Sequence, residues 1–211
     1  MRKELVINKS KTILLILAGG QSRRFGGGYK TLYKFNKISI LDRIIQNFKK
    51  LEIEIVLNVN SNEDQFLKTG LPLIKDELEN FQGPLAGIYS SMKWVLENRK
   101  NIEWIFTSPS DTPFLNKSLV NKFLSTNYNN KTNIVIAKSS NKTHPVIGFW
   151  HISLIKSLEE FLTKDNRKIM HWVEGQNYEI LNFENKNNFF NINTQADLEE
   201  AIKIEESLKK L

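Results

Sequence analysis

The stretch TILLILAGGQSRRFGGGYK, residues 12–30, decides the fold of this 211-residue chain. Residues 12–18 form a continuous apolar run, which predicts a strand buried on both faces, as in a parallel sheet. A glycine-rich loop follows, which carries Arg24 and closes on Lys30. Glycines let backbone amides approach phosphate oxygens, and the two cations can neutralise a polyphosphate. The loop therefore predicts a site for a nucleoside triphosphate, with a flexible surface loop as the alternative.

Strands and helices alternate along the rest of the chain. Apolar patterns predict strands at 53–59, 71–74, 103–108, 133–138, 145–150 and 178–183, and helices at 39–50, 61–68, 84–97, 116–125, 152–163 and 195–209. This alternation is typical of an α/β fold with a mainly parallel sheet, a Rossmann-like three-layer sandwich. No linker or repeat interrupts it, so we expect one domain over residues 1–211, with residues 1–11 as a flexible, polar arm.

Composition limits the classes of function. The chain has no cysteine, which excludes disulfides, thiolate catalysis and cysteine-bound zinc, and fits a reducing compartment. The longest apolar run near the N-terminus is too short to span a bilayer and has no cleavage site after it, so we expect a cytoplasmic protein without a membrane partner. The net charge of +7 suits an anionic ligand, or simply reflects a lysine-rich composition. Because the basic residues form no long cluster, we expect no nucleic-acid partner.

Polar residues and glycine follow the first four predicted strands. Gly19 follows the first strand, Asn58 lies at the end of the second, Asp76 follows the third and Asp111 follows the fourth. In open α/β sheets, ligands bind beyond the carboxyl ends of the strands, so these residues are expected around one crevice. Each position alone also fits a turn or a helix cap, as for Asp111 shortly before Pro113.

The glycine-rich loop matches neither the P-loop spacing nor the G-x-G-x-x-G pattern. The segment LAGGQSRRFGGGYK, residues 17–30, instead resembles the signature loop of nucleotidyltransferases, and its LAGG form is most similar to the MobA family, the molybdenum cofactor guanylyltransferases. Further blocks agree in order: KDELENFQGPLAGI (75–88), SPSDTPFL (108–115), HPVIGFW (144–150) and FFNINTQADL (189–198). One position departs from the usual loop, because Tyr29 stands where an aspartate is common, and this puts the positioning of the loop in doubt.

The resemblance implies the nucleotide-diphospho-sugar transferase type of fold and a specific reaction. GMP passes from GTP to the terminal phosphate of molybdopterin carrying molybdenum, and pyrophosphate leaves. A phosphate monoester is already ionised at neutral pH, so the reaction needs no general base and depends on holding two anions together. The implied catalytic residues are Arg24, Lys30 and Asp111, with Asp111 as the ligand of Mg²⁺.

The resemblance also implies where each substrate binds. Asn191 and Asn193 resemble a polar pair on the pterin side, although Asn193 or Thr194 can instead cap the last helix. His144 is either a polar group near this second substrate or a surface histidine. A transient contact with a molybdenum-inserting enzyme is expected for delivery of the pterin. The implied nucleotide-binding residues are Leu17, Ala18, Gly19, Lys30, Asn58, Asp76 and Asp111.

Two other functions remain open from the sequence. One is a related transferase that uses CTP or acts on a sugar or alditol phosphate; the LAGG and DTPF segments argue against it. The other is a nucleotide-binding protein without catalysis, and Tyr29 is the one residue that favours it.

Overall fold

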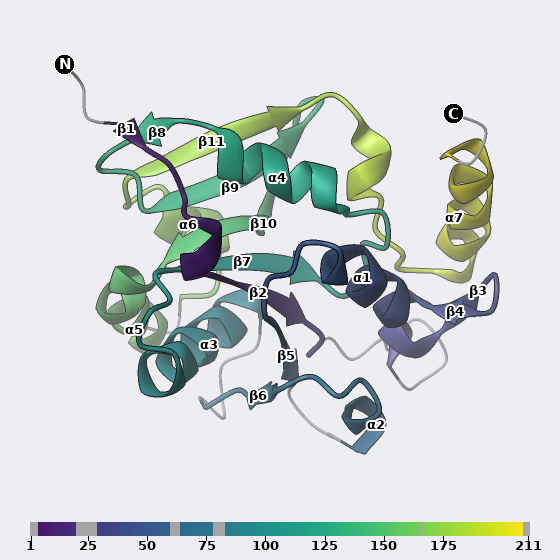
Figure 1. Cartoon of the computed structure of the whole chain (residues 1–211), viewed down its shortest axis with the longest axis horizontal. Coiled ribbons are helices and arrows are strands. Elements are labelled where there is room, and N and C mark those ends of the chain that lie inside the picture. The colour runs from purple at the N-terminus through teal and green to yellow at the C-terminus, as the bar shows by residue number, and fades with distance from the viewer. Residues whose placement is uncertain (1–3, 20–28, 60–63, 78–82, 165, 209–211) are drawn as a thin grey trace.

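A seven-stranded sheet forms the centre of the molecule (Figure 1). This computed structural model describes residues 4–19, 29–59, 64–77, 83–164 and 166–208. The strands of the sheet are β2 (Thr12–Leu17), β5 (Ile55–Val59), β6 (Leu73–Lys75), β7 (Trp104–Pro109), β9 (Ile134–Ser139), β10 (Lys142–His151) and β11 (Tyr178–Phe183). They lie in the order β11-β9-β10-β7-β2-β5-β6. All neighbours pair in parallel except at β10, which runs antiparallel to β7 and β9, so the mainly parallel sheet is confirmed.

Helices cover both faces of this sheet, which confirms the three-layer prediction (Figure 1). One face carries α1 (Ile40–Lys49), α2 (Asp64–Leu67), α4 (Lys117–Ser125) and α7 (Gln195–Leu208). The other face carries α3 (Pro84–Asn98), α5 (Ile155–Thr163) and α6 (Ile169–Val173). Successive side chains of a strand point to opposite faces, so β2 supplies Leu14 and Ile16 to one core and Ile13 and Leu15 to the other. This double burial explains why its sequence is continuously apolar.

Local signals fix where the helices begin. Ser39 Oγ accepts a hydrogen bond from the Asp42 amide at 3.0 Å and caps α1. Asn116 Oδ1 caps α4 in the same way, at 3.1 Å from the Leu119 nitrogen. The first residue of α3 is Pro84, where a missing N–H costs no helical hydrogen bond. Each cap gives a partner to an amide that the helix itself leaves unbonded.

Residues 4–11 differ from the flexible arm expected from the sequence. The strand β1 (Glu4–Leu5) pairs antiparallel with β8 (Tyr128–Asn129), and the Ile7 side chain is buried. A 3-10 turn over Lys9–Lys11 then leads into β2. The expectation is wrong for these residues because their partner strand lies far away in the chain and their own apolar pattern is very short.

Two further differences concern short strands. The loop expected up to residue 38 contains a hairpin of β3 (Lys34–Phe35) and β4 (Ile38–Ser39), turning at Asn36 and Lys37. The strand predicted from residue 145 begins earlier, at Lys142. The second difference changes which side chains reach the site.

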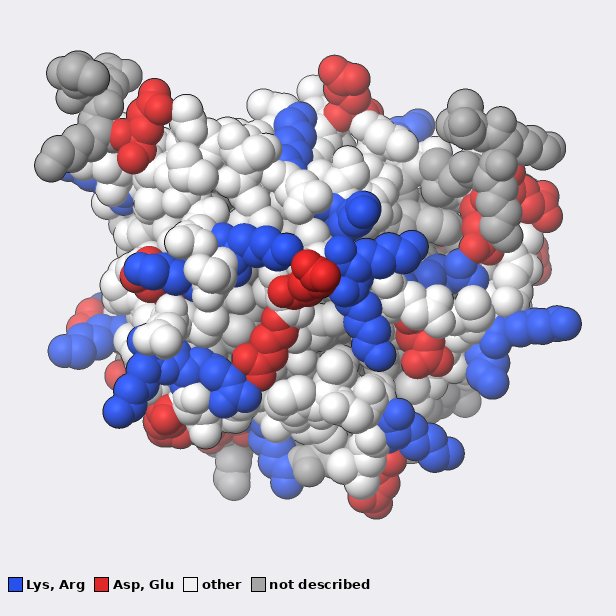
Figure 2. Space-filling model, in the orientation of Figure 1, with Lys and Arg blue, Asp and Glu red and all other residues white. Residues whose placement is uncertain are grey.

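Charge is distributed rather than concentrated on the visible face. Figure 2 shows lysine and arginine side chains spread over this face, with acidic side chains between them. Within the described part of the chain, no helix is long and apolar enough to cross a membrane.

Candidate active site

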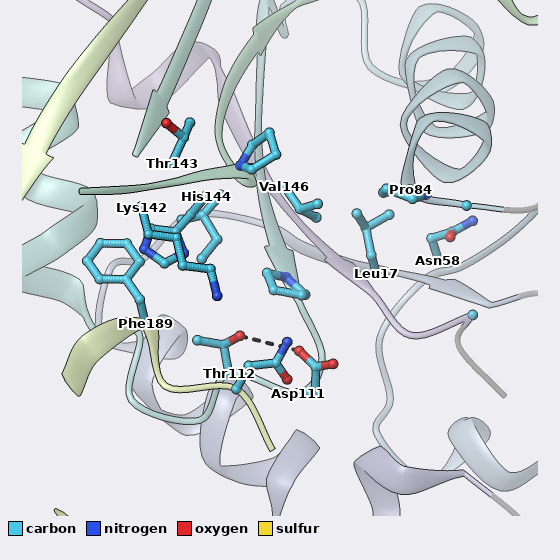
Figure 3. Close-up of a pocket in the computed structure, with 16 residues that line it drawn as sticks. Leu17, Asn58, Pro84, Asp111, Thr112, Lys142, Thr143, His144, Val146 and Phe189 are labelled. Atoms are coloured by element: carbon cyan, nitrogen blue, oxygen red, sulfur yellow. Dashed lines mark hydrogen bonds between the residues drawn. The ribbon is translucent and has the colours of Figure 1, made fainter. Parts of the chain in front are cut away.

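A pocket of about 420 Å³ opens at the sheet edge where the parallel strands end (Figure 3). Gly19, Asn58 and Asp111, which the sequence placed after strands, all line it. The antiparallel strand β10 contributes its beginning instead of its end. Because it runs opposite to its neighbours, its first residues lie at the same edge as the last residues of the other strands.

Three of the predicted site residues, far apart in the chain, meet at one point. Lys30 Nζ donates to Asp111 Oδ2 at 2.6 Å and to Asn193 Oδ1 at 2.8 Å. The side chains of Lys30 and Asp111 are only 14% and 19% exposed, so water screens their attraction weakly. Asp111 does not cap α4, because Asn116 does. A cation, a carboxylate and an amide therefore converge where phosphates and a divalent cation can bind.

The main chain around Asp111 is held from three sides. The Ser110 amide donates to the Leu17 carbonyl at 3.1 Å, and Thr31 Oγ1 donates to the Ser110 carbonyl at 3.0 Å. The Ile192 amide donates to the Asp111 carbonyl at 2.9 Å. The carboxylate is thus positioned by backbone contacts that do not depend on a ligand.

The Asn58 amide connects the pocket to Asp76. Its Nδ2 donates to Asp76 Oδ1 at 2.8 Å and to the Ile74 carbonyl at 3.2 Å. Burial raises the pKa of the Asp76 carboxyl, and the hydrogen bond from Asn58 opposes that rise. Of these two, Asn58 lines the pocket, while Asp76 reaches it through Asn58. The predicted ligand contact of Asp76 stays a prediction.

Close packing of α3 fixes this side of the pocket. A Cβ atom at Gly87 would lie 2.3 Å from Asn58 Oδ1 and 2.7 Å from Leu17 Cδ2. Leu17 lines the pocket, whereas Ala18 is buried and its amide donates to the Asn58 carbonyl at 2.9 Å. Glycine at position 87 therefore allows the helix to lie directly against two lining side chains.

The strand β10 departs from regular pairing where it meets the pocket. His144 lies opposite Ala137, yet Gly148 lies opposite Ile136, so residues 145–147 are extra on this strand. Proline has no N–H to donate to a ladder and is found at such bulges, and here Pro145 begins the irregular stretch. The bulge brings residues 145–147 into the pocket lining.

His144 forms a flat wall of the pocket with Phe189. The two rings stack at 4.4 Å between centroids and 17° between planes. Ser139 Oγ lies 2.8 Å from His144 Nε2. Burial, with a smaller effect from Lys142, lowers the pKa of His144 to about 4. The ring is therefore neutral at neutral pH, and it lines the pocket rather than the open surface.

Thr194 caps the last helix, and the pterin-side role of Asn191 and Asn193 stays a prediction. The side chain of Thr194 accepts from the Asp197 amide at 3.2 Å, and Asp197 Oδ2 accepts from the Thr194 amide at 2.8 Å, a reciprocal cap of α7. The Asn193 side chain bonds Lys30 instead, and Asn191 lines the pocket.

Tyr29, the unusual residue of the loop, faces the interior. Its side chain is 8% exposed and meets Phe66 of α2 edge to face, at 5.0 Å between ring centroids. This contact joins the residue immediately before Lys30 to α2. Arg24, the other predicted cation of the loop, lies outside the described residues.

Asp111 is the carboxylate of the site that could hold a divalent metal. No group of three or more histidine, cysteine or acidic residues gathers within the described ranges. Asp111 Oδ2 is bonded to Lys30, while Oδ1 accepts, from the residues that the structure describes, a single long hydrogen bond of 3.3 Å from Thr112. One carboxylate suits a hard divalent cation that takes its other ligands from substrate phosphates and water.

Sequence reasoning missed the contribution of Lys142, which lines the pocket. Two residues separate the ends of β9 and β10, and one of them, Ser140, has a φ of +52°. A two-residue connection is typical of an antiparallel hairpin. Reading residues 139–142 as a hairpin would have indicated that β10 starts at the ligand-binding edge.

The matching family model and the relatives that are similar in sequence agree on one family. Residues 14–179 match the family model described as the MobA-like NTP transferase domain. The chain is 36% identical to the molybdenum cofactor guanylyltransferase of Nitrobacter hamburgensis, over 89% of this chain and 91% of that protein. It is 34% identical to the protein of the same name from Mesorhizobium japonicum, over 92% and 96%.

A solved structure shares the fold. The molybdopterin-guanine dinucleotide biosynthesis protein A of Archaeoglobus fulgidus matches with a TM-score of 0.72 at 19% identity, covering 92% of this chain and 98% of that chain. At this identity the match shows a common architecture.

Proposed function

The chain belongs to the MobA-like NTP transferase family, which confirms the resemblance seen in the sequence, and we propose that it transfers GMP from GTP to the terminal phosphate of molybdopterin. The products are the guanine dinucleotide of the pterin and pyrophosphate. The proposal includes molybdenum-bearing pterin as acceptor, a single catalytic domain, a cytoplasmic location and a transient contact with a molybdenum-inserting enzyme.

One observation carries the proposal. Lys30, Asp111 and Asn193 meet within hydrogen-bond distance, beside a pocket large enough for a small-molecule ligand. A transferase that joins two anions needs opposite charge at the point where they meet. Lys30 and Asp111 supply this charge beyond the carboxyl ends of the strands, which is where ligands bind in open α/β sheets.

The chemistry asks little of the side chains beyond positioning. An oxygen of the acceptor phosphate forms a bond to the α-phosphorus of GTP, while the bond from that phosphorus to the β-phosphate oxygen breaks. Pyrophosphate leaves with the electron pair. Lys30 turns from Asp111 to the phosphates, and Arg24 assists it from the loop. His144 is neutral and no proton acceptor is required, because the attacking oxygen is already ionised.

Asp111 holds Mg²⁺ in this proposal, with Oδ1 as the available oxygen. The ion supplies Lewis-acid neutralisation of the phosphates when bound. Leu17, Gly19 and Asn58 contact the nucleotide, and Asp76 keeps the Asn58 amide in a fixed orientation. Ala18 acts through its backbone.

Pyrophosphate release is the decisive test. The protein is incubated with Mg²⁺, molybdopterin and one of GTP, CTP or ATP. We expect pyrophosphate release with GTP but not with CTP or ATP, and only when molybdopterin is present. Release with CTP supports the related transferase instead. Stabilisation by GTP in a thermal shift experiment without turnover on any acceptor points to a binding protein and contradicts the proposal.

A further inference from the structure

The pocket has two chemically different ends, with Asp111 between them. Figure 3 shows the polar amide and apolar residues of one end far from the stacked rings of the other. Under the proposed function, the triphosphate occupies the end formed by β2, β5 and α3, so the second substrate approaches from the opposite end. We call these the nucleotide half (Leu17, Asn58 and Pro84) and the acceptor half (Lys142, His144 and Phe189).

Lys142 is a cation that the proposed reaction has not used. In Figure 3 its side chain runs from β10 into the pocket, toward Thr112 and Asp111. Among the residues that the structure describes, its ammonium has no ion pair or hydrogen bond. His144 beside it is neutral, so Lys142 supplies the positive charge of this half.

The backbone of Lys142 is held in place. Lys142 pairs with Ser139 across the hairpin, and His144 pairs with Ala137 just before the bulge. The ammonium thus extends on a flexible stem from a fixed base, between the flat ring wall and the Asp111 carboxylate. A substrate with a planar ring system and a terminal phosphate can place its rings against the His144–Phe189 pair and its phosphate at the Lys142 ammonium, closer to Asp111.

We propose that Lys142 binds the terminal phosphate of the acceptor and directs it toward the α-phosphate of GTP, with the acceptor's rings beside His144 and Phe189. This assignment rests on the proposed function. Lys30 then serves the phosphates of the nucleotide half, and Lys142 serves the phosphate of the acceptor half. Two cations near Asp111, one for each substrate, reduce the repulsion between the substrates.

Equilibrium binding tests the assignment without any turnover. Molybdopterin and its phosphatase-treated form are titrated into nucleotide-free wild type, Lys142→Gln and Lys142→Arg, with the fluorescence of the pterin as readout. Lys138→Gln is the matched control, because it removes the same charge at a position on the same hairpin, opposite Thr143. The GTP dissociation constant of each variant is measured in parallel.

The expected result is a loss of phosphate recognition. Wild type and the Lys138→Gln variant bind the phosphorylated pterin about tenfold more tightly than the dephosphorylated form, because a charge-assisted hydrogen bond is involved. Lys142→Gln binds both forms alike, Lys142→Arg keeps the preference, and the GTP constant is unchanged in all variants. The losses of pterin-binding free energy caused by removing the phosphate and by removing the Lys142 cation are then non-additive.

Three results overturn the assignment. The first is a Lys142→Gln variant that still prefers the phosphorylated pterin, and the second is wild type that shows no preference. The third is a weakened GTP affinity with unchanged pterin binding, which assigns Lys142 to the triphosphate. A protein that shows the expected binding pattern but releases no pyrophosphate leaves the Lys142 assignment standing and contradicts the transfer reaction alone.

Discussion

The nucleotide half and the acceptor half of the pocket are built by different means. The nucleotide half consists of parallel strand ends locked by a helix, with Gly87 directly against Asn58 and Leu17. The acceptor half consists of the start of an antiparallel strand with a bulge after His144. Neighbouring strands on both sides hold the end of a parallel strand in one conformation. A bulge instead turns side chains toward the pocket that regular strand pairing would direct elsewhere. Under the proposed function, the rigid nucleotide half binds the nucleoside triphosphate, and the irregular acceptor half binds the pterin.

Asp111→Asn should have the largest effect, because Asp111 borders both halves. Loss of the carboxylate removes the predicted Mg²⁺ ligand, and we expect turnover to fall by about 10²–10³-fold. The measurement is the rate of pyrophosphate release at saturating GTP. Glu97→Gln, at an exposed position near the end of α3, is the control and should retain wild-type turnover. A near-normal rate for Asp111→Asn would mean that neither half depends on this carboxylate.

Tyr29→Ala tests whether the nucleotide half depends on the aromatic contact with Phe66. Truncation of a buried aromatic ring should lower the free energy of unfolding by about 3 kcal/mol. We also expect weaker GTP binding, because the backbone before Lys30 loses its support. Urea unfolding and GTP titration measure the two effects, and Tyr29→Phe, which keeps the ring, should stay closer to wild type. Unchanged GTP affinity in a destabilised Tyr29→Ala would restrict this ring to a structural role.

Gly87→Ala probes the tight packing of the same half. The new methyl group collides with Asn58 and Leu17, and overpacking of this kind costs about 1–3 kcal/mol. GTP affinity should fall while the affinity for the acceptor stays the same. At Gly175 an added Cβ would meet its nearest neighbour at 3.4 Å, so Gly175→Ala is the control. Equal loss of both affinities would show that the halves are not independent.

His144→Gln should have the smallest effect and should depend on pH. Folding lowers the pKa of His144 from 6.5 to about 4, so the unfolded chain binds more protons between these values. The stabilisation is complete above pH 6.5 and is lost as the pH falls toward 4, and the variant should show a shallower decline. His151, whose pKa burial also lowers, keeps part of the slope. Unfolding free energies above and below pH 6.5 provide the measurement, and a decline as steep as that of wild type would contradict it.

The sequence predicted the nucleotide half better than the acceptor half, for a physical reason. Buried parallel strands are apolar on both faces, so β2 and the positions that follow it could be recognised from the chain alone. The segment KTHP at the start of β10 has no such pattern, because its conformation comes from pairing with β9 rather than from its own residues. The same reason applies to β1, whose partner lies far along the chain.

Side-chain partnerships were also beyond the sequence. Asp76 was expected at the ligand, and its hydrogen bond to Asn58 depends on the neighbouring strands β5 and β6 being in register. Tyr29 looked like a departure that weakens the loop, yet the ring has a buried partner in Phe66. Residue type alone does not reveal such pairs, because each joins segments that meet only in the folded chain.

Lys30 lies 81 residues before Asp111 and 163 residues before Asn193 in the chain. During synthesis on the ribosome, a chain that has emerged as far as α4 already contains the glycine-rich loop and Asp111. It still lacks Asn191, Asn193 and the Ile192 amide that donates to the Asp111 carbonyl. The pocket is therefore completed only after Asn193 has been synthesised, and a chain that stops before this residue lacks the contacts of Asn193 and Ile192 at Asp111 and Lys30.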